Sequence, residues 1–354
     1  MNKMTEIRRT AAITGVHAWA PRNVVSNSRL EQLMETTDEW ITARTGIKER
    51  RWMEEPGLAT SDLAVKAVEG LLRKTGTNPL DVELLICCTA TPDMAFPATA
   101  NVITDKLGMT QTAGFDLSAA CSGFLFGVNT AARFIESGIY QKVIVVGADK
   151  MTSIIDLQER STAIIFGDGA GAVLLEPDSD GFGVLDGIMR SDGVGRTYLC
   201  QKAGGSLNPA SPETVARKEH FIHQEGKTVF KFAVTNMAGV AEEIMERNGL
   251  TADDVQWLVP HQANKRIIDA TRERTALPEE KVMVNIQRYG NTTNASIPLC
   301  LHEWEPQLKK GDNLILAAFG GGFTWGSLYV RWAFDGAKAL NLTDVQPGQL
   351  NLIP

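Results

Sequence analysis

Short apolar runs alternate with longer amphipathic stretches along most of the chain. The runs have the length of strands, end near Gly, Pro or Asp, and cover residues 84–88, 143–147, 258–260 and 314–318. The longer stretches carry apolar residues every three or four positions and cover residues 61–74, 122–137, 232–248 and 264–275. Because the runs are continuously apolar, they predict strands buried on both faces, with helices as crossovers between them. The pattern predicts an α/β fold.

One pattern occurs twice in the chain. The sequence Asp-Val-Glu-Leu-Leu-Ile at 81–86 resembles Asp-Val-Gln-Trp-Leu-Val at 254–259, and each is followed by a polar loop and a predicted helix. If the alignment of these two segments is continued along the chain with a shift of three residues, Cys121 aligns with Asn291. Both residues are therefore predicted to lie at equivalent ends of paired strand–helix units.

The repeat divides the chain into two predicted halves, residues 1–180 and 181–354. Gly, Ser and Pro interrupt the pattern from about residue 177 to 226, which we expect to connect the halves, and the chain from about residue 336 should form a surface tail. In open α/β sheets, ligands bind beyond the carboxyl ends of the strands. Two such halves would therefore bring three residues toward one crevice: Cys121, His261 and Asn291.

The composition is that of a globular protein with a large core, since 44% of the 354 residues are hydrophobic and 22% are charged. A formal net charge of -7 argues against nucleic acid or an anionic membrane as the main partner, because the field of the protein repels phosphates. The five cysteines are odd in number and widely spread, so they predict free thiols in a reducing compartment. No signal peptide or membrane-spanning run is recognisable, and we expect a cytoplasmic protein.

Cys121 stands where a predicted strand turns into a predicted helix, in the sequence DLSAACSGF. A thiol there faces the positive end of the helix dipole, which is expected to lower its pKa and to favour the thiolate. The small neighbours Ala119 and Gly123 let the backbone approach a substrate closely, so that the N–H of Cys121 can serve as an oxyanion donor. Most cysteines are small buried hydrophobes, and the two within the run 84–88 fit that interpretation.

His261 follows an apolar run and precedes a predicted helix, so its imidazole is expected to project from the carboxyl end of a strand rather than into a core. A lone histidine is more often structural, and this position favours the functional interpretation. The other histidines have no companion cysteines or carboxylates at metal-ligand spacing, so we predict no metal site. They are His17, His220, His223 and His302.

Asn291 follows Gly290 and opens another predicted helix. Asn is a favoured helix N-cap, so this residue alone does not decide between a structural and a catalytic role. The glycine-rich loops at 167–171 and 320–326 each lead into a strand-like run rather than a helix, which disfavours a dinucleotide cradle. They fit tight turns and close backbone approach.

Eight ordered segments resemble the β-ketoacyl-acyl-carrier-protein synthase III family of the thiolase superfamily, and the resemblance covers nearly the whole chain. It implies a thiolase-like fold, in which two duplicated α/β halves form a five-layered αβαβα arrangement, and a homodimer. The duplicated fold agrees with the repeat described above. The segments are TTDEWITARTGIKERR, AFPATA, DLSAACSGF, IIFGDGAGAVLLE, VFKFAV, WLVPHQANKRI, YGNTTNASIP and AFGGGFTWG.

The resemblance also implies an activity, that of the initiating condensing enzyme of type II fatty acid synthesis. Cys121 would take an acetyl or other short acyl group from coenzyme A, and decarboxylative condensation with malonyl-acyl carrier protein would give 3-ketoacyl-acyl carrier protein, CO2 and CoA. His261 and Asn291 would donate hydrogen bonds to the malonyl thioester. The backbone amides of Cys121 and Gly321 would form the oxyanion hole. No metal or redox cofactor is implied.

The same resemblance suggests which residues bind the substrates. Trp40, Arg44 and Arg160 match positions that clasp the adenine end of coenzyme A, where an aromatic ring and guanidinium groups suit stacking on a base. Asn264 would contact the pantetheine arm, and Phe96 would reach across the dimer to bound the acyl pocket. A local positive patch would receive the acidic carrier protein. Its residues would be Gln262, Lys265, Arg266, Lys231 and Arg274.

The chain departs from the family pattern beside the predicted site. Thr293 and Asn294 stand where many members have Ser-Ala, and Ser122 stands where Ala is common, which leaves the acyl preference open. A related synthase of secondary metabolism or of long-chain acyl condensation would carry the same motifs. A degradative thiolase needs a second cysteine to move a proton, and none follows Cys300.

Two alternatives from other classes are disfavoured. A cysteine hydrolase of the papain type also orders its residues Cys, His, Asn, but the internal repeat and the lack of secretion features count against it. A non-catalytic acyl-binding protein would not need the set of three candidate catalytic residues.

Overall fold

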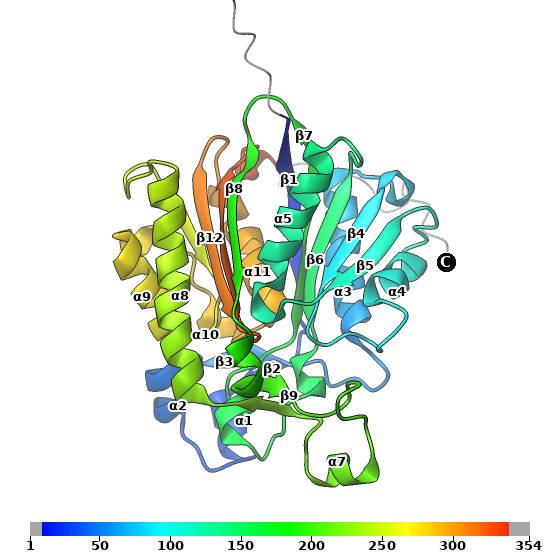
Figure 1. Ribbon diagram of the computed structural model, residues 1–354, viewed down its shortest axis with the longest axis vertical. Coiled ribbons are helices and arrows are strands. Elements are labelled where there is room, and N and C mark those ends of the chain that lie inside the picture. Colours follow the sequence, from blue (N-terminus) through cyan, green and yellow to red (C-terminus); the bar gives the residue numbers. More distant parts are fainter. Residues whose placement is uncertain (1–8, 340–354) are drawn as a thin grey trace, which may run out of the picture.

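Two mixed β-sheets form the frame of the computed structural model, which describes residues 9–339 (Figure 1). The first sheet has the strand order β1-β7-β6-β4-β5. In that order the strands are Thr10–Trp19, Gly169–Asp178, Val143–Asp149, Leu84–Cys88 and Ala113–Leu117. The second sheet has the order β11-β12-β13-β8, with strands Trp257–Pro260, Asn313–Gly320, Thr324–Arg331 and Gly183–Ser191.

Helices cover both faces of each sheet and so complete five layers (Figure 1). The outer face of the first sheet carries α3 (Thr60–Thr75) and α4 (Thr99–Lys106). The outer layer beside the second sheet consists of α8 (Gly226–Arg247) and α9 (Lys265–Thr275). Between the sheets lie α5 (Gly123–Glu136) and α11 (Ser296–Trp304). The arrangement is the predicted αβαβα fold.

The two sheets repeat one connectivity. In the first half the order along the chain is β4, α4, β5, α5, β6, β7, and in the second it is β11, α9, a single bridge, α11, β12, β13. The bridge pairs Val282 with Leu258 in parallel and takes the place of β5. The strands β1 and β8 close equivalent edges, beside β7 and β13. Cys121 and Asn291 therefore precede equivalent helices, α5 and α11, as the repeat in the sequence predicts.

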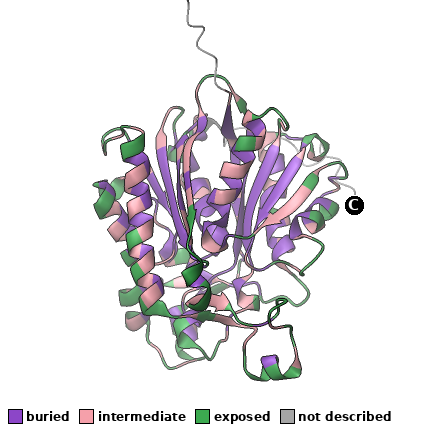
Figure 2. Ribbon diagram, viewed as in Figure 1, coloured by how far each residue is buried: buried purple, intermediate pink, exposed green. Residues whose placement is uncertain are grey.

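The burial pattern explains why the central strands have continuously apolar sequences. Every residue of β4 and β6 is buried, because helices pack on both faces of the sheet (Figure 2). The edge strand β5 differs, since its residues are half-buried or exposed. It has only one neighbouring strand, β4.

Several short elements surround the layered frame. The pairs β2–β3 and β9–β10 form two small antiparallel sheets, with bounds Val24–Ser26, Glu49–Arg51, Leu199–Gln201 and Ile222–Gln224. The remaining α-helices are Asn27–Glu31 (α1), Asp38–Thr45 (α2), Arg160–Ala163 (α6), Pro212–Ala216 (α7), Ile286–Tyr289 (α10) and Gly336–Ala339 (α12). Within residues 9–339, no helix has both the length and the apolar composition of a membrane span.

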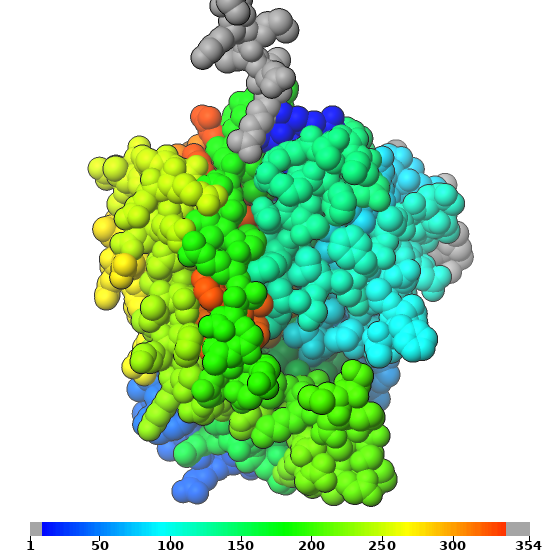
Figure 3. Space-filling view, in the orientation of Figure 1, coloured from blue at the N-terminus to red at the C-terminus, as the bar shows by residue number. Residues whose placement is uncertain are grey.

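Two features differ from a simple division into halves. The segment containing α2 and β3 packs against α9 and α10, so part of the N-terminal sequence lies on the C-terminal half. The helix α8 begins at Gly226, before the predicted start at residue 232, and residues of its first two turns line the cavity described below. The segment coloured green in Figure 3, near residue 200 on the colour bar, runs over the face between yellow-green α8 and blue-green α5.

Most of the predicted C-terminal tail, residues 340–354, lies outside the described residues.

Candidate active site

Residues from both halves line one cavity of about 510 Å³. Cys121 comes from the first half, whereas His261 and Asn291 come from the second. The sequence therefore correctly predicts that these three residues share a crevice. Much of the remaining wall is apolar and includes Met151, Ile154, Leu199, Val229 and Phe319.

Cys121 lies in the short 3-10 turn Ala120–Ser122, between the end of β5 and the start of α5. Ala120 has a left-handed φ of 45°, which turns the chain sharply before the cysteine. The glycine-rich loop after β12 packs directly against this turn, since a Cβ on Gly320 would lie 2.6 Å from the Cys121 nitrogen. Gly321 lies beside Ala120 and also lines the cavity. Only residues without a Cβ permit this approach.

The protonation state of Cys121 differs from the one predicted from the sequence. Burial raises the pKa of the Cys121 thiol to about 12, and the buried Asp149 carboxylate adds to this rise. The prediction of a lowered pKa and a thiolate is therefore wrong for the free protein. The helix dipole favours the charged form only near the helix terminus, and the loss of water around the sulfur outweighs it here.

His261 directly follows β11, and its backbone N–H donates to the carbonyl of Ala317 on the neighbouring strand. The side chain is buried, and its Nδ1 lies 2.7 Å from the hydroxyl of Ser296. The other ring nitrogen, Nε2, is buried without a hydrogen-bond partner in the described part of the protein. Burial lowers the pKa of His261 to about 3, so the imidazole is neutral at physiological pH.

Asn291 lies in the loop between α10 and the turn that precedes α11. Backbone hydrogen bonds hold it on both sides: its N–H donates to Ile165, and its carbonyl accepts from Gly167. Its side-chain Oδ1 accepts a 2.9 Å hydrogen bond from the N–H of Thr293. The side-chain oxygen thus caps the following turn, and only the Nδ2 amide group is left to donate to another molecule.

The three residues predicted to clasp the adenine end of coenzyme A lie together on the surface. The guanidinium carbons of Arg44 and Arg160 lie 4.2 and 4.5 Å from the ring centroid of Trp40. Arg160 also donates to the carbonyl of Glu35. Arg160 belongs to a short helix whose next residue, Ser161, lines the cavity, so the cluster lies beside the cavity.

Asn264 and Phe96 have different environments. Asn264 lines the cavity, where its Oδ1 caps α9 by accepting from the N–H of Arg266 and its Nδ2 donates to the carbonyl of Arg44. It therefore joins the Trp40 helix α2 to α9. Phe96 is 85% exposed, so it bounds no pocket within a single chain.

Four of the five residues predicted to dock the carrier protein lie on α8 and α9, which pack side by side. Lys231, Arg266 and Arg274 are exposed, and Lys265 is partly exposed. Lys265 pairs with Asp269, Arg274 pairs with Glu242, and the Arg266 guanidinium lies 4.6 Å from the ring centroid of Phe230. The fifth residue, Gln262, does not belong to this surface.

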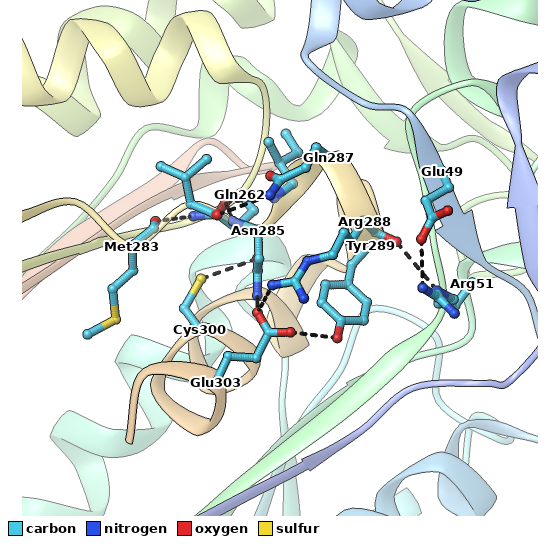
Figure 4. Close-up of polar contacts among 12 residues, drawn as sticks. Glu49, Arg51, Gln262, Met283, Asn285, Gln287, Arg288, Tyr289, Cys300 and Glu303 are labelled. Carbon is cyan, nitrogen blue, oxygen red and sulfur yellow. Dashed lines mark hydrogen bonds and ion pairs between the residues drawn. The ribbon is translucent and has the colours of Figure 1, made fainter. Parts of the chain in front are cut away.

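Gln262 is buried, with only 1% of its surface exposed, and the prediction that it docks the carrier protein is wrong. Its Nε2 donates to the carbonyls of Pro260 and Met283, and its Oε1 accepts from the N–H groups of Asn285 and Ile286 (Figure 4). The side chain thus ties the end of β11 to the start of α10. The family resemblance placed Gln262 with the surface residues of the docking patch, but the turn after His261 directs it inward.

A polar cluster continues from Gln262 toward α11 (Figure 4). Asn285 donates to Glu303, which also accepts from Arg288 and from the hydroxyl of Tyr289. These bonds fix α10, and α10 leads directly into Asn291. Among the described residues, no group of three His, Cys, Asp or Glu side chains is arranged to hold a metal ion.

Comparisons with known proteins agree with this geometry. Residues 115–193 and 245–332 match the models of 3-oxoacyl-[acyl-carrier-protein (ACP)] synthase III and of its C-terminal part. A β-ketoacyl-[acyl-carrier-protein] synthase III of Bacteroides thetaiotaomicron is 52% identical over 93% of this chain and 98% of its own. That of Chlorobaculum tepidum is 55% identical over 91% and 99%. The crystal structure of a 3-oxoacyl-[acyl-carrier-protein] synthase III from Aquifex aeolicus is 40% identical in sequence and superposes with a TM-score of 0.83. The match covers 91% of this chain and all of that chain.

The chain belongs to the 3-oxoacyl-[acyl-carrier-protein] synthase III family. This family membership makes it an acyltransferase, the initiating condensing enzyme of fatty acid synthesis. The similarity extends over nearly the full length of the chain, so it includes both halves and the positions of Cys121, His261 and Asn291.

Reasoning from the sequence missed two further residues beside the site of this synthase III. Ser296 contacts His261, and Asp149 contacts Thr293 and Asn294 next to Asn291. Ser296 and Asp149 lie 35 and more than a hundred residues from their partners, so no local pattern reveals the contacts. An aspartate that ends an apolar run, as Asp149 does, is the one available signal, because such a carboxylate is buried.

Proposed function

We propose that Cys121 is the nucleophile of this condensing enzyme and that His261 and Asn291 supply the side-chain donors for condensation. The supporting observation is that all three line one cavity although they come from different halves of the chain. The acyl donor is acetyl-CoA or another short acyl-CoA, and the second substrate is malonyl-acyl carrier protein.

In the first stage, the sulfur of Cys121 attacks the thioester carbon of the acyl-CoA. The carbon–sulfur bond to coenzyme A breaks, and the proton of the Cys121 thiol leaves with the coenzyme A thiol, so that protons balance. The N–H groups of Cys121 and Gly321 bind the developing oxyanion, because they flank the close contact between the nucleophile turn and the glycine-rich loop. The acyl group then occupies the apolar part of the cavity.

In the second stage, the malonyl thioester loses CO2, and the electron pair of the broken C–C bond forms an enolate. Donors from His261 and Asn291 stabilise the enolate oxygen more strongly than the neutral thioester oxygen, and one such donor contributes about 3 kcal/mol. The enolate carbon attacks the acyl group on Cys121. The cysteine sulfur leaves as a thiolate and takes up a proton from solvent, and a 3-ketoacyl thioester results.

The adenine of coenzyme A binds between Trp40 and Arg160 in this proposal. In the free protein the Arg160 guanidinium already lies 4.5 Å from the centroid of the Trp40 ring. A base stacked on both sides needs roughly 7 Å, which is two van der Waals contacts. Arg160 therefore swings away from the ring as the base enters, and its bond to the Glu35 carbonyl breaks.

The carrier protein docks on Lys231, Lys265, Arg266 and Arg274, and Asn264 contacts the pantetheine arm. Exposed cations on α8 and α9 suit an acidic partner, although the chain carries a net charge of -7. Asn264 lines the cavity at the start of α9, next to these residues. Nucleic acid and membrane partners remain excluded from the proposal on charge and composition.

A homodimer completes the site in this proposal. The edge strand β5 has one open side and leads directly to Cys121, and an open edge is a natural surface for pairing with a second copy. Phe96, at 85% exposed, would extend into the partner's acyl pocket. Sedimentation that returned only monomer at micromolar concentration would contradict the dimer.

The remaining parts of the proposal concern cofactor and compartment. The steps above need no metal or redox cofactor, since thioester exchange, loss of CO2 and carbon–carbon bond formation balance without an external oxidant or reductant. All five cysteines are free thiols, which suits the reducing cytoplasm. The division into halves at residue 180 also stays a prediction.

Intact mass spectrometry tests the nucleophile. The wild-type protein incubated with acetyl-CoA should gain one acetyl group and lose it when malonyl carrier protein is added, whereas Cys121→Ala should gain none. Labelling by longer acyl-CoAs but not by acetyl-CoA would show that acetyl-CoA is not the acyl donor. A wild type that accepts no acyl group would contradict the proposed nucleophile. Product analysis with several acyl donors identifies the preferred acyl group.

A further inference from the structure

The hydroxyl of Ser296 and the ring of His261 form an isolated buried pair. The Nδ1–Oγ distance is 2.7 Å, and both side chains are at most 2% exposed. The Ser296 hydroxyl makes no other hydrogen bond in the described part of the chain, and Nε2 of the same ring has no partner. The possible positions of the ring proton and the hydroxyl proton can therefore be enumerated.

A neutral imidazole carries one ring proton, and a hydroxyl carries one more. If Nδ1 held the ring proton, it would donate to the serine oxygen, and the hydroxyl hydrogen would be buried without an acceptor. If the hydroxyl donates to Nδ1 instead, the ring proton resides on Nε2. The second arrangement satisfies the serine hydrogen, and a buried donor without an acceptor is costly.

We infer that Ser296 is a positioning residue that holds His261 in the tautomer with the proton on Nε2, so that this nitrogen presents a donor to the substrate. The inference rests on the proposed function for its catalytic meaning, but the tautomer itself does not. A histidine with the opposite tautomer would direct a lone pair at the enolate oxygen and repel it.

The second donor is held in the same way. The Oδ1 of Asn291 accepts from the N–H of Thr293, so only the Nδ2 amide group of Asn291 is free to meet the substrate. Thr293 and Ser296 both belong to the turn and first residue that start α11. One short segment thus occupies the acceptor atom of each side chain and leaves both donors available.

This tautomer has a consequence for the first stage. Because Nε2 already carries a proton and the ring stays neutral, His261 is not arranged to accept the thiol proton of Cys121. Acylation should therefore be insensitive to Ser296, whereas decarboxylation should depend on it. A purely structural serine would affect both stages together.

Nitrogen-15 NMR of histidine-labelled protein tests the inference directly. The chain has five histidines, so the ring signals of His261 can be assigned by comparison with His261→Asn. Near neutral pH the wild type should show a protonated Nε2 and an unprotonated Nδ1. The opposite pattern would overturn the inference, whatever reaction the enzyme catalyses.

Kinetics of Ser296→Ala provide the second measurement, with Ser327→Ala as a matched control. Ser327 is also fully buried in the second half, but its hydroxyl donates to the carbonyl of Leu316 and not to His261. Ser296→Ala should slow malonyl decarboxylation about tenfold or more at unchanged KM and leave acetylation of Cys121 within about twofold. Ser327→Ala should slow neither stage by more than about twofold.

The outcomes separate the two levels of inference. Equal slowing of both stages in Ser296→Ala, or equal effects of the two serine variants, would overturn the positioning role. A wild type with the expected tautomer but no acylation of Cys121 would contradict only the proposed function. If Ser296→Ala does not fold, Ser296→Thr, which keeps the hydroxyl, should retain the wild-type NMR pattern, and a wild type with the proton on Nδ1 would still overturn the inference.

Discussion

The carboxylate of Asp149, at the end of β6, accepts a 2.8 Å hydrogen bond from the side-chain amide of Asn294 in the second half. The same oxygen accepts from the hydroxyl of Thr293, and the other oxygen accepts from Thr89 and Thr91. Burial raises the pKa of Asp149, while the bonds from Thr293 and Asn294 lower it. One buried carboxylate thus joins the halves beside the active site, and it contacts Thr293 and Asn294, two of the three residues that depart from the family pattern.

The close packing of Asn294 predicts a strong effect of a single methyl group. A Cβ on Gly147 would lie 2.3 Å from the backbone oxygen of Asn294. Gly147→Ala should lower the free energy of unfolding by about 1–3 kcal/mol, because overpacking forces the two halves apart. Urea denaturation measures this change. In Gly239→Ala, the added methyl meets nothing within 4 Å, and higher helix propensity should stabilise α8 by up to about 1 kcal/mol. Similar losses in both variants would contradict the packing argument.

The raised pKa of Cys121 predicts the pH dependence of its alkylation. With a pKa of about 12, the reactive thiolate fraction rises with pH throughout the accessible range. The rate of iodoacetamide labelling at Cys121 should therefore increase about tenfold per pH unit between roughly pH 7 and 10. Peptide mass spectrometry identifies the site, and Cys121→Ala provides the control. A plateau below about pH 8 would show that the helix terminus outweighs burial after all.

The two roles of the Asn291 side chain can be separated by a pair of substitutions. Asn291→Asp keeps an oxygen that accepts from the Thr293 N–H but removes the amide donor, whereas Asn291→Ala removes both. Both variants should still be acetylated at Cys121. Both should lose about a hundredfold or more in malonyl decarboxylation, measured as CO2 release. Recovery of activity in the aspartate variant would assign Asn291 to capping alone.

Substitutions of Gln262 and Arg266 are expected to have different effects on stability. Gln262→Ala leaves the N–H groups of Asn285 and Ile286 without their acceptor, and should lower the free energy of unfolding by about 2 kcal/mol or more. Arg266→Ala removes an exposed cation and should scarcely change stability.

Carrier-protein kinetics complete this comparison. Arg266→Ala should raise the KM for malonyl carrier protein but not for malonyl-CoA, because in the proposed docking only the carrier contacts the α8–α9 surface. Gln262→Ala should show no such preference between the two malonyl donors. A carrier-specific defect in Gln262→Ala would restore Gln262 to the docking surface.

The sequence by itself predicted the central strands and helices and the candidate reacting residues. Continuous apolar runs predict strands such as β4 and β6 because burial on both faces leaves no place for polar side chains. The repeat around 81–86 and 254–259 predicted the duplicated topology, and the position of Cys121 before α5 marked it as a candidate nucleophile. These signals are local, since they depend on neighbours within a turn or a strand.

Tertiary structure decided how those residues behave. The direction of Gln262, the pKa of Cys121, and the partners of His261 and Asn291 all depend on contacts between distant segments. Ser296 contacts His261 only because α11 packs against β11, the strand that His261 follows. Protonation and tautomer follow from desolvation and from the orientation of nearby donors, and neither quantity is encoded in the order of residues along a single element.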